Sequence, residues 1–159
     1  MNATLDFKLF KKDDFAEYLS WFQDPSLNAF LGPMEENDEW LTHILKELNE
    51  ETEDRGCTYS VFSNANLVAV VGVAFPTSKF PCYLLTSIAV KPDLRKRGFG
   101  KLVLNTIIDL LPTKEGQNWQ AQVDEKNIIA KSFFENSGWK TVIEPSDNDG
   151  MYLLEYRYS

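Results

Sequence analysis

Hydrophobic and polar residues alternate along the chain in two rhythms, one typical of strands and the other of helices. Near the start, Leu5, Phe7 and Leu9 occupy every second position, which predicts a strand. Between 38 and 51 the apolar residues recur every three or four positions and form one stripe, which predicts an amphipathic helix. The same rhythms predict the other elements. Strands are expected at 4–10, 57–63, 67–75, 82–90, 119–123, 139–143 and 151–157, and helices at 13–23, 38–51, 98–111 and 127–136.

Turn-forming residues separate these elements. Asn64-Ala65-Asn66 and Asp149-Gly150 are typical of tight hairpin turns. Pro92 ends a strand because it lacks an N–H donor, Asn127 is a suitable N-cap for the last helix, and Gly138 is expected in a left-handed conformation after it. The resulting order is β-α-α-β-β-β-α-β-α-β-β, which is neither a regular βαβ repeat nor all-β. It predicts an α/β fold in which helices cover a mixed, mainly antiparallel sheet.

Length and composition favour a single globular domain over residues 1–159. Of the 159 residues, 43% are hydrophobic and 13% aromatic, which suits one core but leaves no room for a second full domain. The longest apolar run, 67–75, is far shorter than the roughly 20 residues of a membrane helix, and residues 1–15 contain no apolar signal core. We therefore expect a cytoplasmic protein without membrane contact, in which Cys57 and Cys82 are reduced.

The charge is acidic as a whole but unevenly distributed. There are 16 Lys and Arg residues against 24 Asp and Glu residues, a formal net charge of -8, which argues against nucleic-acid binding. Residues 91–101 nevertheless hold five basic side chains and one acid, whereas 35–54 hold nine acids and one base. The basic segment indicates either a site for one phosphate-bearing ligand or an ordinary solvated turn. The acidic segment indicates either attraction of a cationic substrate or the solvated face of a helix.

The strongest chemical pattern is a strand, a turn at Pro92, a basic loop with two glycines and an amphipathic helix. The first turn of a helix leaves backbone N–H groups unpaired and carries partial positive charge, which suits a phosphate. Gly98 and Gly100 would let a ligand approach this backbone. Two common phosphate motifs do not fit, because Leu102 stands where a P-loop needs Ser or Thr and Val103 stands where a dinucleotide fingerprint has Gly or Ala. A glycine-rich helix start without any ligand is the alternative.

Two sequence motifs, separated by the distance that one family shows, point to that family. Arg95-x-x-Gly98-x-Gly100, which follows a strand and Pro92, resembles the acetyl-CoA motif (Gln/Arg)-x-x-Gly-x-(Gly/Ala) of the GCN5-related N-acetyltransferases. The segment from Asn127 to Trp139 resembles that family's Asn-x-x-Ala…(Leu/Phe)-Tyr-x-x-x-Gly-Phe pattern. The predicted order of elements agrees with the family's fold over the whole chain. The resemblance implies an acyl-CoA N-acyltransferase fold with acetyl-CoA as cosubstrate. No metal is expected, because one His and two separated Cys cannot build a standard zinc site.

The resemblance also implies where acetyl-CoA binds. The strands at 82–90 and 119–123 would splay apart, and the pantetheine arm would lie between them against the backbone near Ile88 and Val90. The pyrophosphate would lie on N–H groups of the glycine loop, and Asn127 would hold the cofactor arm. The residues expected to bind the cofactor are Ile88, Val90, Arg95, Lys96, Arg97, Gly98, Phe99, Gly100, Lys101, Asn127 and Phe134.

By the same resemblance, an amine attacks the thioester directly, without a covalent enzyme intermediate. A backbone N–H at Ala89 or Val90 is expected to bind the developing oxyanion. Phe134 stands where the family usually has Tyr, and a phenyl ring cannot give a proton to the leaving thiolate. Candidates for that proton donor are water, Ser87, Tyr83 and Tyr59. Candidates for the base that takes the proton of the amine are a water chain, Asp124, Glu125, Glu35 and Glu36.

The sequence alone is compatible with three functions. The preferred one is an N-acetyltransferase whose acceptor is a cationic amine, either on a small molecule such as a polyamine or an aminoglycoside or at a protein N-terminus. The second, which Phe134 favours, is an acyl-CoA sensor or interaction module with little turnover. The third is a nucleotide-binding domain that uses the same glycine turn. The oligomeric state is also open, and a homodimer is one alternative.

Overall fold

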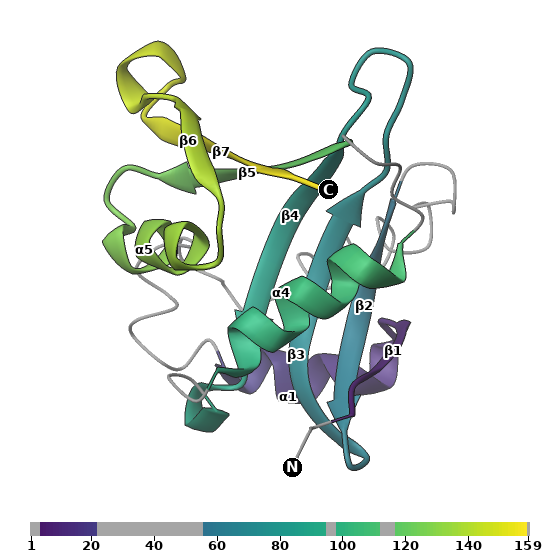
Figure 1. Cartoon of the computed structure of the whole chain (residues 1–159). Coiled ribbons are helices and arrows are strands. Elements are labelled where there is room, and N and C mark those ends of the chain that lie inside the picture. Colours follow the sequence, from purple (N-terminus) through teal and green to yellow (C-terminus); the bar gives the residue numbers. More distant parts are fainter. Residues whose placement is uncertain (1–3, 22–55, 95–97, 112–116, 159) are drawn as a thin grey trace.

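The computed structural model describes residues 4–21, 56–94, 98–111 and 117–158, which are built around one seven-stranded sheet of order β1-β2-β3-β4-β5-β7-β6 (Figure 1). Among these strands only β4 and β5 run parallel, and all other neighbours are antiparallel. The expectation of a mixed, mainly antiparallel sheet is therefore confirmed. The strands are β1 (Asp6–Leu9), β2 (Gly56–Ser63), β3 (Asn66–Ala74), β4 (Tyr83–Val90), β5 (Asn118–Asp124), β6 (Lys140–Ile143) and β7 (Met151–Arg157).

The helices lie on both faces of the sheet. Figure 1 shows α4 crossing in front of β2, β3 and β4, and α1 behind the sheet. None of the helices in the described ranges is long and apolar enough to cross a membrane. The helix expected at 38–51 lies outside the described residues. The helical elements are η1 (Lys12–Asp14), α1 (Phe15–Trp21), η2 (Pro92–Leu94), α4 (Phe99–Leu110), α5 (Ile128–Asn136) and η3 (Pro145–Asp147).

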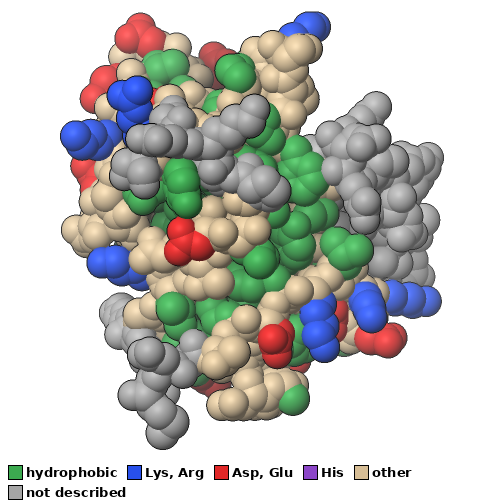
Figure 2. Space-filling model, turned by 45° about the vertical axis from the view of Figure 1, so that its right-hand side comes forward, with side chains coloured by type: hydrophobic (Ala, Val, Ile, Leu, Met, Phe, Trp, Pro, Cys, Tyr) green, Lys and Arg blue, Asp and Glu red, His purple; other side chains and the backbone are tan. Residues whose placement is uncertain are grey.

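Two hydrophobic clusters hold the sheet between these helices. The larger one, called the main core here, packs Leu104 and Ile107 of α4 and Phe134 of α5 against the sheet. On the α4 side of the molecule hydrophobic side chains also reach the surface near the middle, while charged side chains gather mainly toward the periphery (Figure 2). The smaller cluster lies on the other face of the sheet and is called the α1 cluster here. It consists of Trp21, Leu67, Val70 and Ala89.

The turns agree with their sequence signals. Asn64 and Ala65, between β2 and β3, have φ angles of 51° and 66°, and Asp149 and Gly150, before β7, have φ angles of 51° and 80°. Such left-handed residues match the twist of a hairpin. Gly138, with φ of 92°, follows the last residue of the α5 cap, as expected for a glycine that ends a helix.

The first helix begins differently from expectation. The sequence predicts a cap at Asp13 and Asp14, but the 3-10 turn η1 starts at Lys12 and runs directly into α1. The carboxylate of Asp14 accepts hydrogen bonds from the N–H of Lys11 at 3.1 Å and from the hydroxyl of Ser60 at 2.8 Å. Because Ser60 is fully buried in β2, this bond fixes α1 to the sheet.

Candidate functional site between β4 and β5

β4 and β5 pair over only a short stretch and then separate. The paired residues are Tyr83 with Trp119, Leu84 with Gln120, and Leu85 with Ala121. Beyond these pairs β4 continues along β3 to Val90 and β5 continues along β7, and Figure 1 shows the two strands diverging. The space between them is called the fork here; Leu85 and Ala121 mark its closed end. Its two strand edges leave backbone groups available to an extended ligand.

The register decides which backbone groups face the fork. The N–H of Lys91 donates to the carbonyl of Val68 on β3 at 2.9 Å. In an antiparallel pair every second residue bonds to the partner strand, so Ala89, which is paired with Val70, also points its N–H at β3. The N–H groups of Ile88 and Val90 therefore point toward the fork. Of the two amides proposed as oxyanion donors, Ala89 and Val90, the register directs only that of Val90 into the fork.

The N-terminus of α4 lies beside the open end of β4. Gly98 is its N-cap, with φ of 81°, a left-handed conformation that glycine adopts without strain. The first helical hydrogen bond runs from the N–H of Leu102 to the carbonyl of Gly98 at 3.0 Å. The N–H groups of Phe99 and Gly100 precede it and have no partner four residues back within α4. The predicted phosphate-binding residues Arg95, Lys96 and Arg97 lie outside the described residues, whereas Lys101 follows in the first turn as an exposed side chain.

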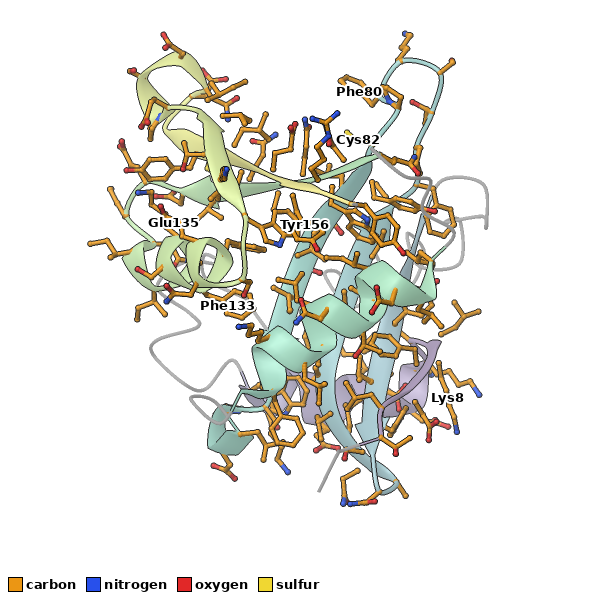
Figure 3. All side chains as sticks on the ribbon, in the orientation of Figure 1. Lys8, Phe80, Cys82, Phe133, Glu135 and Tyr156 are labelled. Atoms are coloured by element: carbon orange, nitrogen blue, oxygen red, sulfur yellow. The ribbon has the colours of Figure 1, made fainter. Side chains whose placement is uncertain are left out.

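Three elements meet at Gly100. A Cβ on this residue would lie 3.0 Å from Cε1 of Phe133 on α5 and 3.7 Å from Cγ2 of Val90 on β4. Figure 3 shows Phe133 extending from α5 toward the first turn of α4. Sequence reasoning treated this glycine as space for a ligand. The structure shows that the side where its side chain would lie is filled by Phe133, so Gly100 permits the contact between α4 and α5.

The loop from β5 into α5 holds two predicted site residues by local hydrogen bonds. Oδ1 of Asn127 accepts the N–H of Ala130 at 3.0 Å, so Asn127 is the N-cap that its sequence position predicts. Its Nδ2 has no hydrogen-bond partner in the part of the chain that the structure describes and is available to a ligand. Asp124, a candidate base, is the exposed last residue of β5, and its Oδ1 accepts the N–H of Lys126 at 2.8 Å.

Phe134 is part of the packing and carries no proton donor. Only 4% of its surface is exposed, and its ring lies 5.3 Å from that of Phe133 and 5.0 Å from that of Trp139, between centroids. Its burial in the main core accounts for an aromatic residue at this position without any catalytic role. A proton for the leaving group must come from elsewhere.

The three proposed substitutes occupy different places. Tyr83 is 6% exposed, stacks on Trp119 at 4.5 Å within the paired stretch, and has a pKa raised by burial. Tyr59 belongs to β2, which β3 separates from β4, and packs edge-on against Phe7. Neither tyrosine lies along the open part of β4. Ser87 does, and its side chain is exposed.

Cys82 is poorly suited to act as a nucleophile. Burial, and then the charge of Glu155, raise the pKa of its thiol, and a thiol with a raised pKa carries less of the reactive thiolate. The residue precedes β4 at the closed end of the fork, away from Phe133 in Figure 3. This arrangement favours direct transfer over a route through a cysteine.

Sequence reasoning missed an irregularity in β4. Gly72 pairs with Ser87 but Val73 pairs with Leu85, so Thr86 is an extra residue in a β-bulge beside the last β4–β5 pair. One signal was present in the sequence: Gly72 interrupts an apolar strand, and such a glycine often marks a bulge or a close approach.

Comparisons with known proteins agree with this architecture. Three solved structures share the fold. An acetyltransferase from Thermus thermophilus is 20% identical, with a TM-score of 0.79 over 97% of both chains. The spermidine N-acetyltransferase from Vibrio cholerae, in complex with CoA and spermine, is 12% identical, with a TM-score of 0.75 over 96% of this chain and 95% of that one. The aminoglycoside N(6')acetyltransferase from Legionella pneumophila is 16% identical, with a TM-score of 0.73 over 99% and 94%.

Sequence comparison identifies the family. No curated protein matches the chain. The family described as "Acetyltransferase (GNAT) family" matches residues 10–139, which include β4, β5, α4 and α5, the strands and helices that border the fork. The chain therefore belongs to the GNAT family of acetyltransferases.

Proposed function

We propose that residues 1–159 form a single acetyltransferase domain that transfers the acetyl group of acetyl-CoA directly to an amine. The observation that carries this proposal is the fork, which ends at the N-terminus of α4. The unpaired edge of β4 offers a site for an extended arm that contains amides, and the helix N-terminus next to it offers a site for a diphosphate.

The chain supplies fixed polar groups for each part of acetyl-CoA. The N–H groups of Phe99 and Gly100, with the charge of Lys101, suit the diphosphate. The backbone of Val90, which lies next to Gly100, and the free Nδ2 of Asn127 suit the pantetheine arm. These groups are the reason for assigning the acetyl-CoA-binding residues to the open end of the fork, beside the N-terminus of α4.

The reaction needs little from side chains. Acetyl-CoA supplies the thioester, and the attacking amine supplies the lone pair. Of the two N–H groups that point into the fork, that of Val90 lies beside Gly100 and the diphosphate site, whereas that of Ile88 lies farther along the pantetheine arm, closer to the closed end, and would stabilise the negative charge that develops on the carbonyl oxygen. As the C–N bond forms and the C–S bond breaks, the amine gives up a proton to water, and the leaving thiolate takes up a proton from water because Phe134 offers none.

A cationic acceptor fits the acidic surroundings. Asp124 ends β5 and Glu125 follows it. The N–H of Glu125 donates to the carbonyl of Gly150 at 3.0 Å, which brings the acidic loop before β7 beside them. The field of such carboxylates attracts ammonium groups. Two structural neighbours are a spermidine N-acetyltransferase and an aminoglycoside N(6')acetyltransferase, which supports amines of these classes as first probes.

The second candidate is an acyl-CoA sensor with little turnover. Phe134 favours it, because the hydroxyl that the family usually carries there is missing and the ring is buried in the main core. A sensor would bind acetyl-CoA as tightly as an enzyme but release no thiol with any amine.

The test combines calorimetry with an assay of thiol release. Lys101→Glu is compared with Lys8→Glu, which makes the same charge change at an exposed lysine on β1, at the far edge in Figure 3. We expect Lys101→Glu to weaken acetyl-CoA binding at least about tenfold and Lys8→Glu to change it less than about twofold. Absence of acetyl-CoA binding by the natural sequence, or stronger binding of ATP or NAD, would contradict the proposal. Binding without thiol release from a broad amine panel would favour the sensor.

A further inference from the structure

Thr86 and Ser87 lie side by side at the closed end of the fork with exposed side chains, although β4 is a central strand. Leu85, just before them, points into the main core, and Ile88, just after them, packs against it. Without a bulge these two positions would fall on opposite faces. The extra residue Thr86 changes the alternation, so both hydroxyl side chains turn to the face that carries α1.

Gly72 makes room for both hydroxyls. Val71 and Val73 point into the main core, so Gly72 between them belongs to the α1 face. A Cβ on Gly72 would lie 2.5 Å from Oγ1 of Thr86 and 2.7 Å from Oγ of Ser87. Neither hydroxyl has a hydrogen-bond partner within the described ranges. Two unpaired hydroxyls thus share one space beside the point where the strands separate.

β5, on the other side of the fork, adds polar groups on the same α1 face of the sheet. Trp119, Ala121 and Val123 are buried in the main core, so Gln120 between them faces the α1 side. Its Nε2 donates to Oε2 of Glu155 on the neighbouring strand β7 at 3.0 Å. At the closed end of the fork, the α1 face of the sheet therefore carries two hydroxyls on β4 and, beyond β5, the carboxylate of Glu155 on β7. The other face is covered by α4 and α5 through the main core (Figure 1).

We propose that the hydroxyls of Thr86 and Ser87 position the acceptor amine, which enters the fork from the α1 face; this inference rests on the proposed transferase function. A neutral primary amine has two N–H donors and one lone pair. Two hydroxyl oxygens accept the donors and leave the lone pair directed at the thioester. The carboxylate of Glu155 provides negative charge that attracts the amine in its ammonium form. Thr86 and Ser87 are positioning residues in this account, since they exchange no proton.

The experiment measures amine and acetyl-CoA kinetics separately in a double variant, Thr86→Val with Ser87→Ala. The probes are spermidine, an aminoglycoside and a peptide that begins with alanine, and the amine with the fastest thiol release is used throughout. We expect the KM for that amine to rise at least about tenfold, because a lost hydrogen bond to a charged or reacting nitrogen has about that effect. Acetyl-CoA affinity by calorimetry and the midpoint of urea unfolding should stay unchanged.

Three further variants make the result specific. Thr86→Ser keeps the hydroxyl and should keep the KM for the amine. Gly72→Ala keeps both hydroxyls but displaces them, so it should raise that KM without changing acetyl-CoA affinity. Thr106→Val removes a hydroxyl that donates to the carbonyl of Leu102 on α4 and should leave the KM for the amine unchanged.

The outcomes separate this inference from the proposed function. If the natural chain binds acetyl-CoA and acetylates an amine, and the double variant keeps the KM for that amine, the positioning role is overturned alone. A parallel loss of acetyl-CoA affinity in the double variant would also overturn it, because the residues would then serve the cofactor. A natural chain that binds no acetyl-CoA, or binds it without acetylating any of the probes, overturns the proposed function and this inference together.

Discussion

Ala89 and Val90 are neighbours, yet their backbone N–H groups point in opposite directions. The bond from Lys91 to Val68 fixes the alternation, so that Ala89 bonds to β3, whereas Ile88 and Val90, on either side of it, face the fork. Side-chain chemistry cannot reveal this difference, because both residues are apolar. At the scale of single residues, therefore, the proposed catalytic group is a backbone amide whose direction the strand register decides.

Proline substitution separates the two amides, because it removes one N–H at a time. Ile88→Pro deletes a donor that no strand uses, so we expect a folded protein whose kcat falls roughly 10²–10³-fold, as for the loss of an oxyanion donor. Ala89→Pro deletes a bond to β3 and should cost about 3 kcal/mol of stability. Urea unfolding and steady-state kinetics measure both effects. Unchanged kcat in folded Ile88→Pro protein would rule out this amide as the oxyanion donor.

Tyr18 is a second residue whose surroundings make a testable difference. Its ring lies among Phe10, Phe15 and Trp21, with centroids 5.5, 6.4 and 5.9 Å away, and burial raises its pKa to about 12 from a usual value of 10.0. Below pH 10 both the folded and the unfolded chain keep the proton, so stability is unaffected. Between pH 10 and 12 only the unfolded chain loses it, and the free energy of unfolding falls as the pH rises.

Tyr18→Phe keeps the ring and removes the titrating group. Urea midpoints at pH 9 and pH 11 should therefore fall less in this variant than in the natural chain. Because other groups titrate in both proteins, the difference between the two losses is the quantity to compare. Equal losses would show that Tyr18 does not bind its proton more tightly in the folded state.

At the scale of elements, α5 combines a structural and a proposed ligand-binding function in one residue. Asn127 uses its Oδ1 to cap the helix, while its Nδ2 is unpaired within the described chain. The loop before it is held by the hydrogen bond that the N–H of Lys126 donates to Oδ1 of Asp124. The two atoms of one side-chain amide can therefore be tested independently.

Asn127→Asp keeps a capping oxygen and removes the N–H donor, whereas Asn127→Ala removes both. We expect Asn127→Ala to lose about 1 kcal/mol of stability and Asn127→Asp to lose less. Acetyl-CoA affinity by calorimetry should fall in both variants, because both lack the donor. Full affinity in Asn127→Asp would show that the side chain serves only the helix.

Much of the fold could be predicted because periodicity and caps are local. The strand expected at 67–75 is β3 (Asn66–Ala74), and the helix expected at 127–136 is α5 (Ile128–Asn136) with Asn127 as its cap. The separation of β4 from β5 came from the family resemblance and is confirmed by the pairing, which stops after Leu85 and Ala121.

The rest of the candidate site depends on contacts between elements, which sequence spacing does not encode. The bulge at Thr86 depends on how β4 slips against Gly72 of β3. The contact of Phe133 with Gly100 depends on how α5 packs against α4. For the same reason Gly98 and Gly100 looked equivalent in the sequence but differ in the structure: the first has a left-handed φ of 81°, and the second adjoins an aromatic ring.

At the scale of the whole molecule, charge and topology support the same proposal. The chain carries a net charge of -8, but the segment from 91 to 101 is basic, and its described parts, 91–94 and 98–101, lie at the open end of the fork. Lys91 at this end is 3.8 Å from the carboxylate of Glu17 on α1. A local positive site in an acidic protein suits an anionic cosubstrate and a cationic acceptor that approach different parts of one fork.

The central claim is that acetyl-CoA lies in the fork against the N-terminus of α4. Amide hydrogen exchange with and without saturating acetyl-CoA tests it most directly, because a ligand that covers free N–H groups slows their exchange. We predict slower exchange at Ile88, Val90, Phe99 and Gly100 and no change in the hairpin of β2 and β3 around Asn64. Unchanged exchange at Ile88 to Gly100, or protection confined to other strands, would contradict the claim.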